Sequence, residues 1–186
     1  MKKLALIIFS LTLSPFALSQ QYLDPDEDFL AIAPAKNQAN DLQKLQAQVN
    51  ALIAGTLKTE KAKKEAAAAA NKLGVWYEKG KGGVLQNYQK AYEHYSLAAS
   101  YNNGYAMHNL GDLYKQGLGV ERSPMTAFSW YQRAAKYHPI GWEDMADCYL
   151  NGFGVEQNRA KAIELYKKAA EKGRKSALKK LANLAQ

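Results

Sequence analysis

The chain has 186 residues, a net charge of +8 and a single cysteine, Cys148. One cysteine excludes an internal disulfide, so we expect a packed small side chain there, with an intermolecular bridge as the alternative. The positive charge is compatible with anionic partners such as nucleic acids. However, the tyrosines recur at core positions of the sequence repeat described below, which argues against their stacking on nucleic-acid bases.

Residues 1–19 have the pattern of a secretory signal peptide. Lys2 and Lys3 precede an apolar run from Leu4 to Leu13, and a small-residue ending closes at Ser19. The run is shorter than the roughly 20 residues that span a bilayer, which disfavours the alternative of a membrane anchor. We therefore expect cleavage after Ser19 and a mature chain of charge +6 in the periplasm or secreted from the cell.

Residues 20–40 are interpreted as an acidic flexible leader. The segment holds four acidic residues and two prolines and shows little apolar periodicity. A short apolar island at Phe29, Leu30 and Ile32 is either a docking peptide or a stretch that packs locally on the rest of the chain.

Residues 41–68 are expected to form an N-terminal amphipathic helical segment that begins with Asp41 as N-cap. Its apolar residues share one helical face: Leu42, Leu45, Val49 and Leu52. Gly55 and Thr56 indicate a break, after which residues 57–79 have strong helix propensity. Two heptads are too few for a self-sufficient coiled coil, so the first helix either packs on the first repeat or pairs with another chain.

Residues 69–173 carry one pattern three times, over about 69–103, 104–138 and 139–173. Each copy reads Gly-x-x-Tyr-x-x-Gly-x-Gly, then Val, then Ala-x-x-x-Tyr-x-x-Ala-Ala, with Ala146 replacing the first glycine of the third copy. The first tyrosines of the copies lie 37 and 35 residues apart: Tyr77, Tyr114 and Tyr149. A period of this length predicts an all-α solenoid of stacked hairpins, each made of a helix A and a helix B.

Small residues should lie where the helices approach most closely, with tyrosines filling the gaps between them. They are Gly74, Gly111 and Ala146 on helix A, and Ala91, Ala127 and Ala162 on helix B. The Gly-x-Gly-Val loops supply left-handed backbone conformations after helix A. Asn87, Ser123 and Asn158 are the predicted N-caps of helix B, and Pro124 suits a first helical position.

Residues 174–186 are expected to form a capping helix with an apolar side and lysines opposite. The stretch from Arg159 to Lys180 holds nine basic residues against Glu164 and Glu171. This basic end either attracts anionic partners or is a solvated face that keeps the protein soluble.

The sequence contains no recognisable catalytic, cofactor or metal motif. The histidines are scattered, and the one pairing across a helical turn, His108 with Asp112, supplies two ligands where a structural zinc needs four. The stretch from Gly80 to Gly83 is better explained as an overlong hairpin loop than as a phosphate-binding loop. We predict no cofactor, no metal and no catalytic residue.

The period and the loops resemble the Sel-1-like repeat family, a relative of the tetratricopeptide repeats. Ordinary tetratricopeptide arrays have a period of about 34 residues, and the Gly-x-Gly-Val loop accounts for the extra length here. The resemblance implies an adaptor with a right-handed superhelix whose concave face, lined by helix A, binds protein segments. A secreted branch of the family, linked to β-lactam binding, has a disulfide in each repeat, and this chain departs from it.

By analogy with tetratricopeptide hairpins, nine helix A residues are expected to face that groove. They are Asn71, Val75, Lys79, His108, Asp112, Gln116, Glu143, Asp147 and Asn151. The alternative for each is a solvated helix face.

The leading hypothesis is a periplasmic, non-enzymatic adaptor that holds a protein of an envelope machine, such as a secretion system or motor. One alternative is a secreted or surface protein for host or cell contact, with its basic end on anionic surfaces. A third is an enzyme acting on peptidoglycan or a β-lactam, for which no constellation of residues is found. We expect no nucleic acid as partner and no membrane span after signal cleavage.

Overall fold

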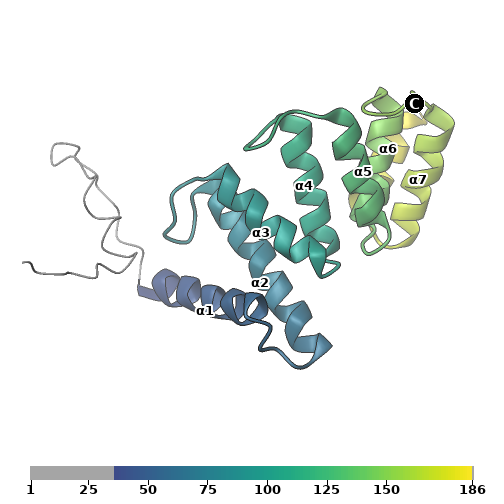
Figure 1. Ribbon diagram of the computed structural model, residues 1–186. Coiled ribbons are helices and arrows are strands. Elements are labelled where there is room, and N and C mark those ends of the chain that lie inside the picture. The colour runs from purple at the N-terminus through teal and green to yellow at the C-terminus, as the bar shows by residue number, and fades with distance from the viewer. Residues whose placement is uncertain (1–35, 186) are drawn as a thin grey trace, which may run out of the picture. The chain divides into compact units, whose positions relative to one another are not determined.

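The computed structural model describes residues 36–185, so the expected signal peptide and most of the expected leader lie outside the described residues. This part of the chain contains eight α-helices and no strand (Figure 1). The helices are α1 (Lys36–Ile53), α2 (Glu60–Lys79), α3 (Tyr88–Ser100), α4 (Gly104–Gln116), α5 (Pro124–Ala135), α6 (Ile140–Asn151), α7 (Arg159–Glu171) and α8 (Lys175–Leu184). The prediction of an all-α repeat solenoid is confirmed.

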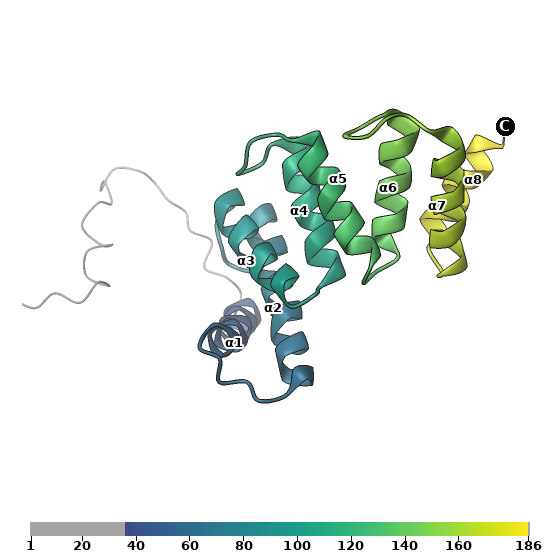
Figure 2. The same ribbon diagram turned by 45° about the vertical axis from the view of Figure 1, so that its right-hand side comes forward.

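Each helix packs on the next one in chain order, so that α2 with α3, α4 with α5 and α6 with α7 form three hairpins (Figure 2). In addition, helix A of the second hairpin, α4, packs directly on helix A of the third, α6. The A helices of these hairpins are therefore close enough for their side chains to touch across the repeat boundary.

Helix α1 packs on the first hairpin. Leu45 and Val49 are buried in the core cluster that contains α2 and α3 residues, and Leu52 lies with Ala66 and Ala67. The expected start at Asp41 was wrong, because the helix already begins at Lys36 and the polar residues between them contain no helix breaker. The packing of α1 within its own chain agrees with the first of the two alternatives for this helix.

The second helix also starts later than its composition suggests. We expected helix from residue 57, but α2 begins at Glu60 after Thr59, which has an extended backbone. The Thr59 hydroxyl accepts a hydrogen bond from the Ala62 backbone N–H at 3.1 Å. A side-chain cap thus sets this boundary, in the way that threonine commonly does.

The predicted N-caps of helix B are confirmed in all three hairpins. The side-chain oxygens of Asn87, Ser123 and Asn158 accept hydrogen bonds from backbone N–H groups three residues later, at 2.9, 3.3 and 2.9 Å. Each helix A ends at a glycine in the left-handed conformation, Gly80, Gly117 or Gly152, with φ of 60, 75 and 67°. Loops and caps therefore repeat together with the core.

The tyrosine of helix B lies directly against the small residue of helix A. Tyr95, Tyr131 and Tyr166 are among the largest fully buried side chains. A methyl group added at Gly74 would come within 2.5 Å of Tyr95 Cδ1, and one added at Gly111 would overlap the Tyr131 ring. The helix A tyrosines at 77, 114 and 149 are only partly buried, so the prediction that tyrosines fill the gaps holds mainly for helix B.

We predict that Gly111→Ala destabilises the protein by about 1–3 kcal/mol, because the added methyl group displaces the Tyr131 ring in a packed core. Urea unfolding followed by circular dichroism measures the change. The reciprocal variant, Ala146→Gly, should lose only the helix-propensity difference of about 1 kcal/mol. An increase in stability for Gly111→Ala, which propensity alone predicts, would contradict the packing argument.

Candidate functional site

The nine helix A residues predicted to face a groove occupy three equivalent positions, counted from the small residue of each helix. Position −3 holds Asn71, His108 and Glu143; position +1 holds Val75, Asp112 and Asp147; position +5 holds Lys79, Gln116 and Asn151. We call these nine residues the helix A row. Because the positions are four residues apart, the row runs along one face of each helix.

The side chains at position −3 bind the next helix A. Asn109 Nδ2 on α4 donates a hydrogen bond to Asn71 Oδ1 on α2 at 2.9 Å. One repeat further on, His108 Nδ1 lies 2.6 Å from Asp144 Oδ2 on α6. Position −3 therefore joins consecutive hairpins through polar contacts.

Glu143 makes the corresponding contact at the end of the stack. Its Oε2 accepts hydrogen bonds from Arg174 Nε at 2.8 Å and from Ser176 Oγ at 2.7 Å, and Lys180 Nζ lies 3.1 Å from Oε1. Only 5% of the residue is exposed. The expectation that Glu143 faces a partner is corrected, because α8 covers this carboxylate.

In the second and third hairpins, the side chain at position +1 binds the tyrosine of helix B in the same hairpin. The Tyr131 hydroxyl donates a hydrogen bond to Asp112 Oδ1 at 2.7 Å, and the Tyr166 hydroxyl donates one to Asp147 Oδ1. Asp147 also binds Lys180 Nζ through Oδ2, at 2.7 Å.

The first hairpin has Val75 at position +1, and this side chain packs against the core. The acceptor there is Glu78, one turn further along α2, whose Oε2 receives the Tyr95 hydroxyl at 2.6 Å. The pairing of tyrosine with acid is therefore kept, although the acid has moved along the helix.

Position +5 is the exposed end of the row. Lys79, Gln116 and Asn151 are all exposed, and Asn151 Nδ2 donates a hydrogen bond to the Asp147 carbonyl at 2.7 Å. Asp112 also keeps 38% of its side chain exposed. Asp147 is similar, with 32% of its side chain exposed, so position +5 is the part of the row that is most accessible to a second molecule.

The partners of the row were missed by the sequence reasoning. Asn109, Asp144 and Arg174 come from the next hairpin or from α8, so no spacing within one copy of the repeat brings them beside position −3. A signal was present, since Asn109 and Asp144 stand at the same position, two residues before the small residue, in consecutive copies.

In the His108–Asp144 contact, two ionisable side chains meet in a mostly buried setting. Burial disfavours the charged imidazolium, but the hydrogen bond and charge of Asp144, together with Asp112, raise the pKa of His108 above its ordinary 6.5. Burial also raises the pKa of the Asp144 carboxyl, against the opposing effect of His108. The contact therefore favours the imidazolium of His108 over the neutral ring, although burial opposes it.

Cys148 is a packed side chain, as expected. It is 3% exposed and lies in a cluster with Phe128 and Tyr131. Burial raises the pKa of its thiol to about 12, so the thiolate needed for redox chemistry or metal binding is disfavoured.

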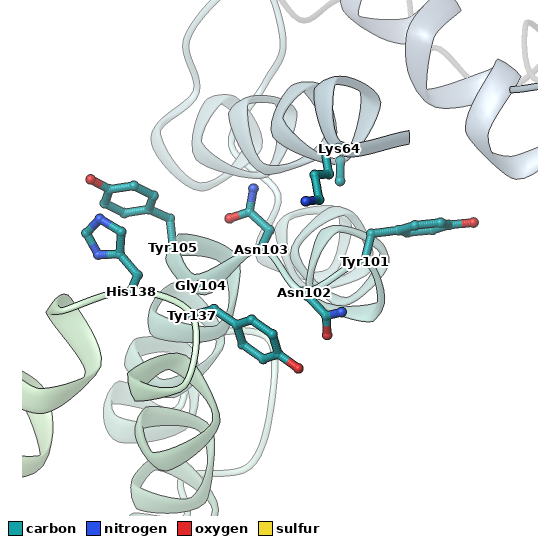
Figure 3. A pocket seen from close by; sticks show the side chains of 9 residues that line it. Lys64, Tyr101, Asn102, Asn103, Gly104, Tyr105, Tyr137 and His138 are labelled. Carbon is teal, nitrogen blue, oxygen red and sulfur yellow. The ribbon is translucent and has the colours of Figure 1, made fainter. Parts of the chain in front are cut away.

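A pocket of about 420 Å³ lies away from the row, where the α3–α4 and α5–α6 turns meet α2 (Figure 3). Tyr105 and His138 stand side by side at one end of it, with ring centroids 4.1 Å apart. Asn102 has a left-handed backbone, with φ of 62°, at the position where Gly173 ends the third helix B. This conformation is therefore a helix ending that asparagine tolerates.

The described residues provide no metal-binding group of three or more His, Cys, Asp or Glu side chains. None of the helices in residues 36–185 has the length and apolarity that a membrane span requires.

The described features agree with a known repeat. The family model for the Sel1 repeat matches residues 67–102, 104–136 and 143–173. Sel-1 homolog 2 of Homo sapiens is 39% identical over 74 residues, which are 39% of this chain and 11% of that protein. A Schizosaccharomyces pombe relative is 41% identical over 54 residues, 8% of its length, so the chain spans about a tenth of these relatives.

Two solved structures are similar over most of the chain. A Sel1 repeat protein from Oxalobacter formigenes is 30% identical with a TM-score of 0.61, and the match covers 77% of this chain and 98% of that one. A protective antigen of uropathogenic Escherichia coli strains, described as displaying an SLR fold, is 28% identical with a TM-score of 0.60. That match covers 81% of this chain and 36% of the antigen.

The raised pKa of His108 predicts a pH-dependent contribution to stability. A raised folded-state pKa stabilises fully below the ordinary value of 6.5 and is lost as pH rises through the folded value. The difference in unfolding free energy between wild type and His108→Asn should therefore shrink as pH rises from about 6 to 8. Burial lowers the pKa values of His94 and His138, so their contributions change with pH below 6.5, on the opposite side from that of His108. Urea unfolding across the range checks this, and a difference that grows with pH would refute it.

Proposed function

The chain belongs to the Sel1 repeat family, and from that premise we propose that it is a non-enzymatic protein-binding scaffold of the bacterial cell envelope. Sel1 repeats are typically protein-interaction units, and stacked hairpins present long rows of side chains to a partner. The observation that carries the proposal is the exposed end of the helix A row, which recurs once in each hairpin on a rigid helix.

We infer the location from the signal-peptide pattern of residues 1–19. The mature protein would then act in the periplasm and support an envelope-spanning machine, such as a secretion system or a motor. One similar protein is described as a protective antigen present in uropathogenic strains. That description supports the second candidate, a secreted or surface protein for host or cell contact.

The residues that make contact would be those that the fold leaves free. Asp147 and Glu143 hold helices together, so replacing them tests stability as much as binding. By contrast, the exposed side chains at position +5 hold no other helix in place: Lys79, Gln116 and Asn151. The proposed partner therefore binds near the Gly-x-Gly ends of the A helices.

We predict that a photo-crosslinking amino acid at Gln116 captures one discrete envelope protein in living cells, whereas the same group at Met125 does not. Met125 is a matched control because it is 74% exposed but lies on helix B. Mass spectrometry identifies the product. Equal capture at both positions would mean that the helix A row is not the contact surface.

The location has its own test. Fractionation combined with N-terminal sequencing should find the mature protein in the periplasm, beginning at Gln20. Recovery in the medium or on the cell surface would favour the second candidate, and an uncleaved cytoplasmic chain would refute export.

A further inference from the structure

The third hairpin only partly buries the side chains at two positions that are core in the other hairpins. These positions are −4 and −1, counted from the small residue of helix A. They hold Ala70 and Leu73 in the first hairpin, and Met107 and Leu110 in the second. All four are at most 1% exposed. Trp142 and Met145 occupy the same positions in the third hairpin and are only partly buried.

The side chains that neighbouring B helices contribute beside these positions differ between repeats. In the second hairpin, Leu97 from α3 and Trp130 from α5 pack against the core cluster that contains Met107 and Leu110. The equivalent residues around the third hairpin are Arg133 on α5 and Leu165 on α7. Arg133 does not fill the space, since its guanidinium lies 4.0 Å from the Trp130 ring centroid.

A groove of about 620 Å³ results between α5 and α7, with Trp142, Met145 and Leu165 among its lining. We call it the α5–α7 groove. An arginine and a smaller apolar residue stand here, where the preceding repeat has a leucine and a tryptophan. The preceding repeat thus shows what kind of side chain fills this space.

The polar residues around the groove are basic or neutral. Its lining includes Arg133 and Lys136, both exposed, and contains no carboxylate. Helix α6 carries three acidic residues, but Glu143, Asp144 and Asp147 are bound to Arg174, His108 and Tyr166. The acidic side chains of α6 are therefore engaged within the protein. Its apolar side chains, Trp142 and Met145, line the groove together with the cationic Arg133 and Lys136.

We propose that the α5–α7 groove is a second docking surface, which binds an acidic amphipathic segment of a protein partner. A bulky apolar side chain of the segment takes the place that Trp130 has in the preceding repeat, and its carboxylates pair with Arg133 and Lys136. An amphipathic helix laid in a groove is a common recognition mode. The inference rests on the proposed protein-binding function, but not on the helix A row.

Synthetic helical peptides of about four turns test the proposal. One peptide carries leucine and phenylalanine on one face and glutamate on the other, and a second has lysine in place of glutamate. Fluorescence anisotropy with the full mature chain measures affinity. Arg133→Leu and Leu165→Trp copy the residues that fill the preceding repeat, Arg133→Glu reverses the rim charge, and Gln116→Ala is the control on the helix A row.

The acidic peptide should bind wild type and Gln116→Ala equally, and the lysine peptide at least about tenfold more weakly. Both filling variants should lose binding to a similar extent, and Arg133→Glu should reverse the preference. Arg133 is exposed, so Arg133→Leu should do so at an unchanged melting temperature, which separates loss of the groove from unfolding at the buried Leu165. The proposal is overturned by equal binding of the two peptides, by filling variants that bind like wild type, or by no binding of the acidic peptide.

A second copy of the chain is the competing occupant. Self-association of wild type that Leu165→Trp abolishes, measured by sedimentation, would assign the groove to that copy and overturn the acidic segment. If crosslinking at Gln116 persists in Leu165→Trp while the acidic peptide fails to bind wild type, only the groove inference fails. If the photo-crosslinker at Gln116 captures no partner in the otherwise wild-type chain, the result counts instead against the helix A row as a contact surface.

Discussion

The contact between the helix B tyrosine and the small residue of helix A is the constraint on which the rest of the structure depends. The ring can pack directly against helix A only where the side chain is absent or reduced to a methyl group, as at Gly74, Gly111 and Ala146. Once buried there, the hydroxyl needs an acceptor, because an unpaired buried polar group is costly. Glu78, Asp112 and Asp147 provide it.

This constraint decides which residues remain free for function. The acids at position +1 are held by tyrosines, and position −3 joins each helix A to the next, so most of the helix A row stabilises the stack. Among the nine residues, only those at position +5 are fully exposed. On the other side of α6, the exchange of two covering residues opens a groove that the earlier hairpin keeps filled. The three hairpins thus share one mode of packing but expose different surfaces.

Much of the architecture was predictable, because helix caps, glycine loops and the hairpin period are local signals that one copy of the repeat contains. Asn87, Ser123 and Asn158 show this, since each cap acts within three residues of itself. The burial and the binding partners of the helix A row were not predictable in the same way. His108 and Glu143 look like surface residues within their own copies, and only the next hairpin or α8 supplies the groups that bind them. The position of Glu78, one turn away from its repeat equivalent, departs from the period itself.

The most direct measurement is a double-mutant cycle between helix A and helix B of the second hairpin. Tyr131→Phe removes the hydroxyl, Asp112→Asn removes the charge of its acceptor, and the double variant removes both. If the pair holds the hairpin, the two changes should be coupled by about 1–2 kcal/mol in unfolding free energy. Free energies that add within about 0.5 kcal/mol would show that the pair does not hold the hairpin, and Asp112 would then be free to bind a partner.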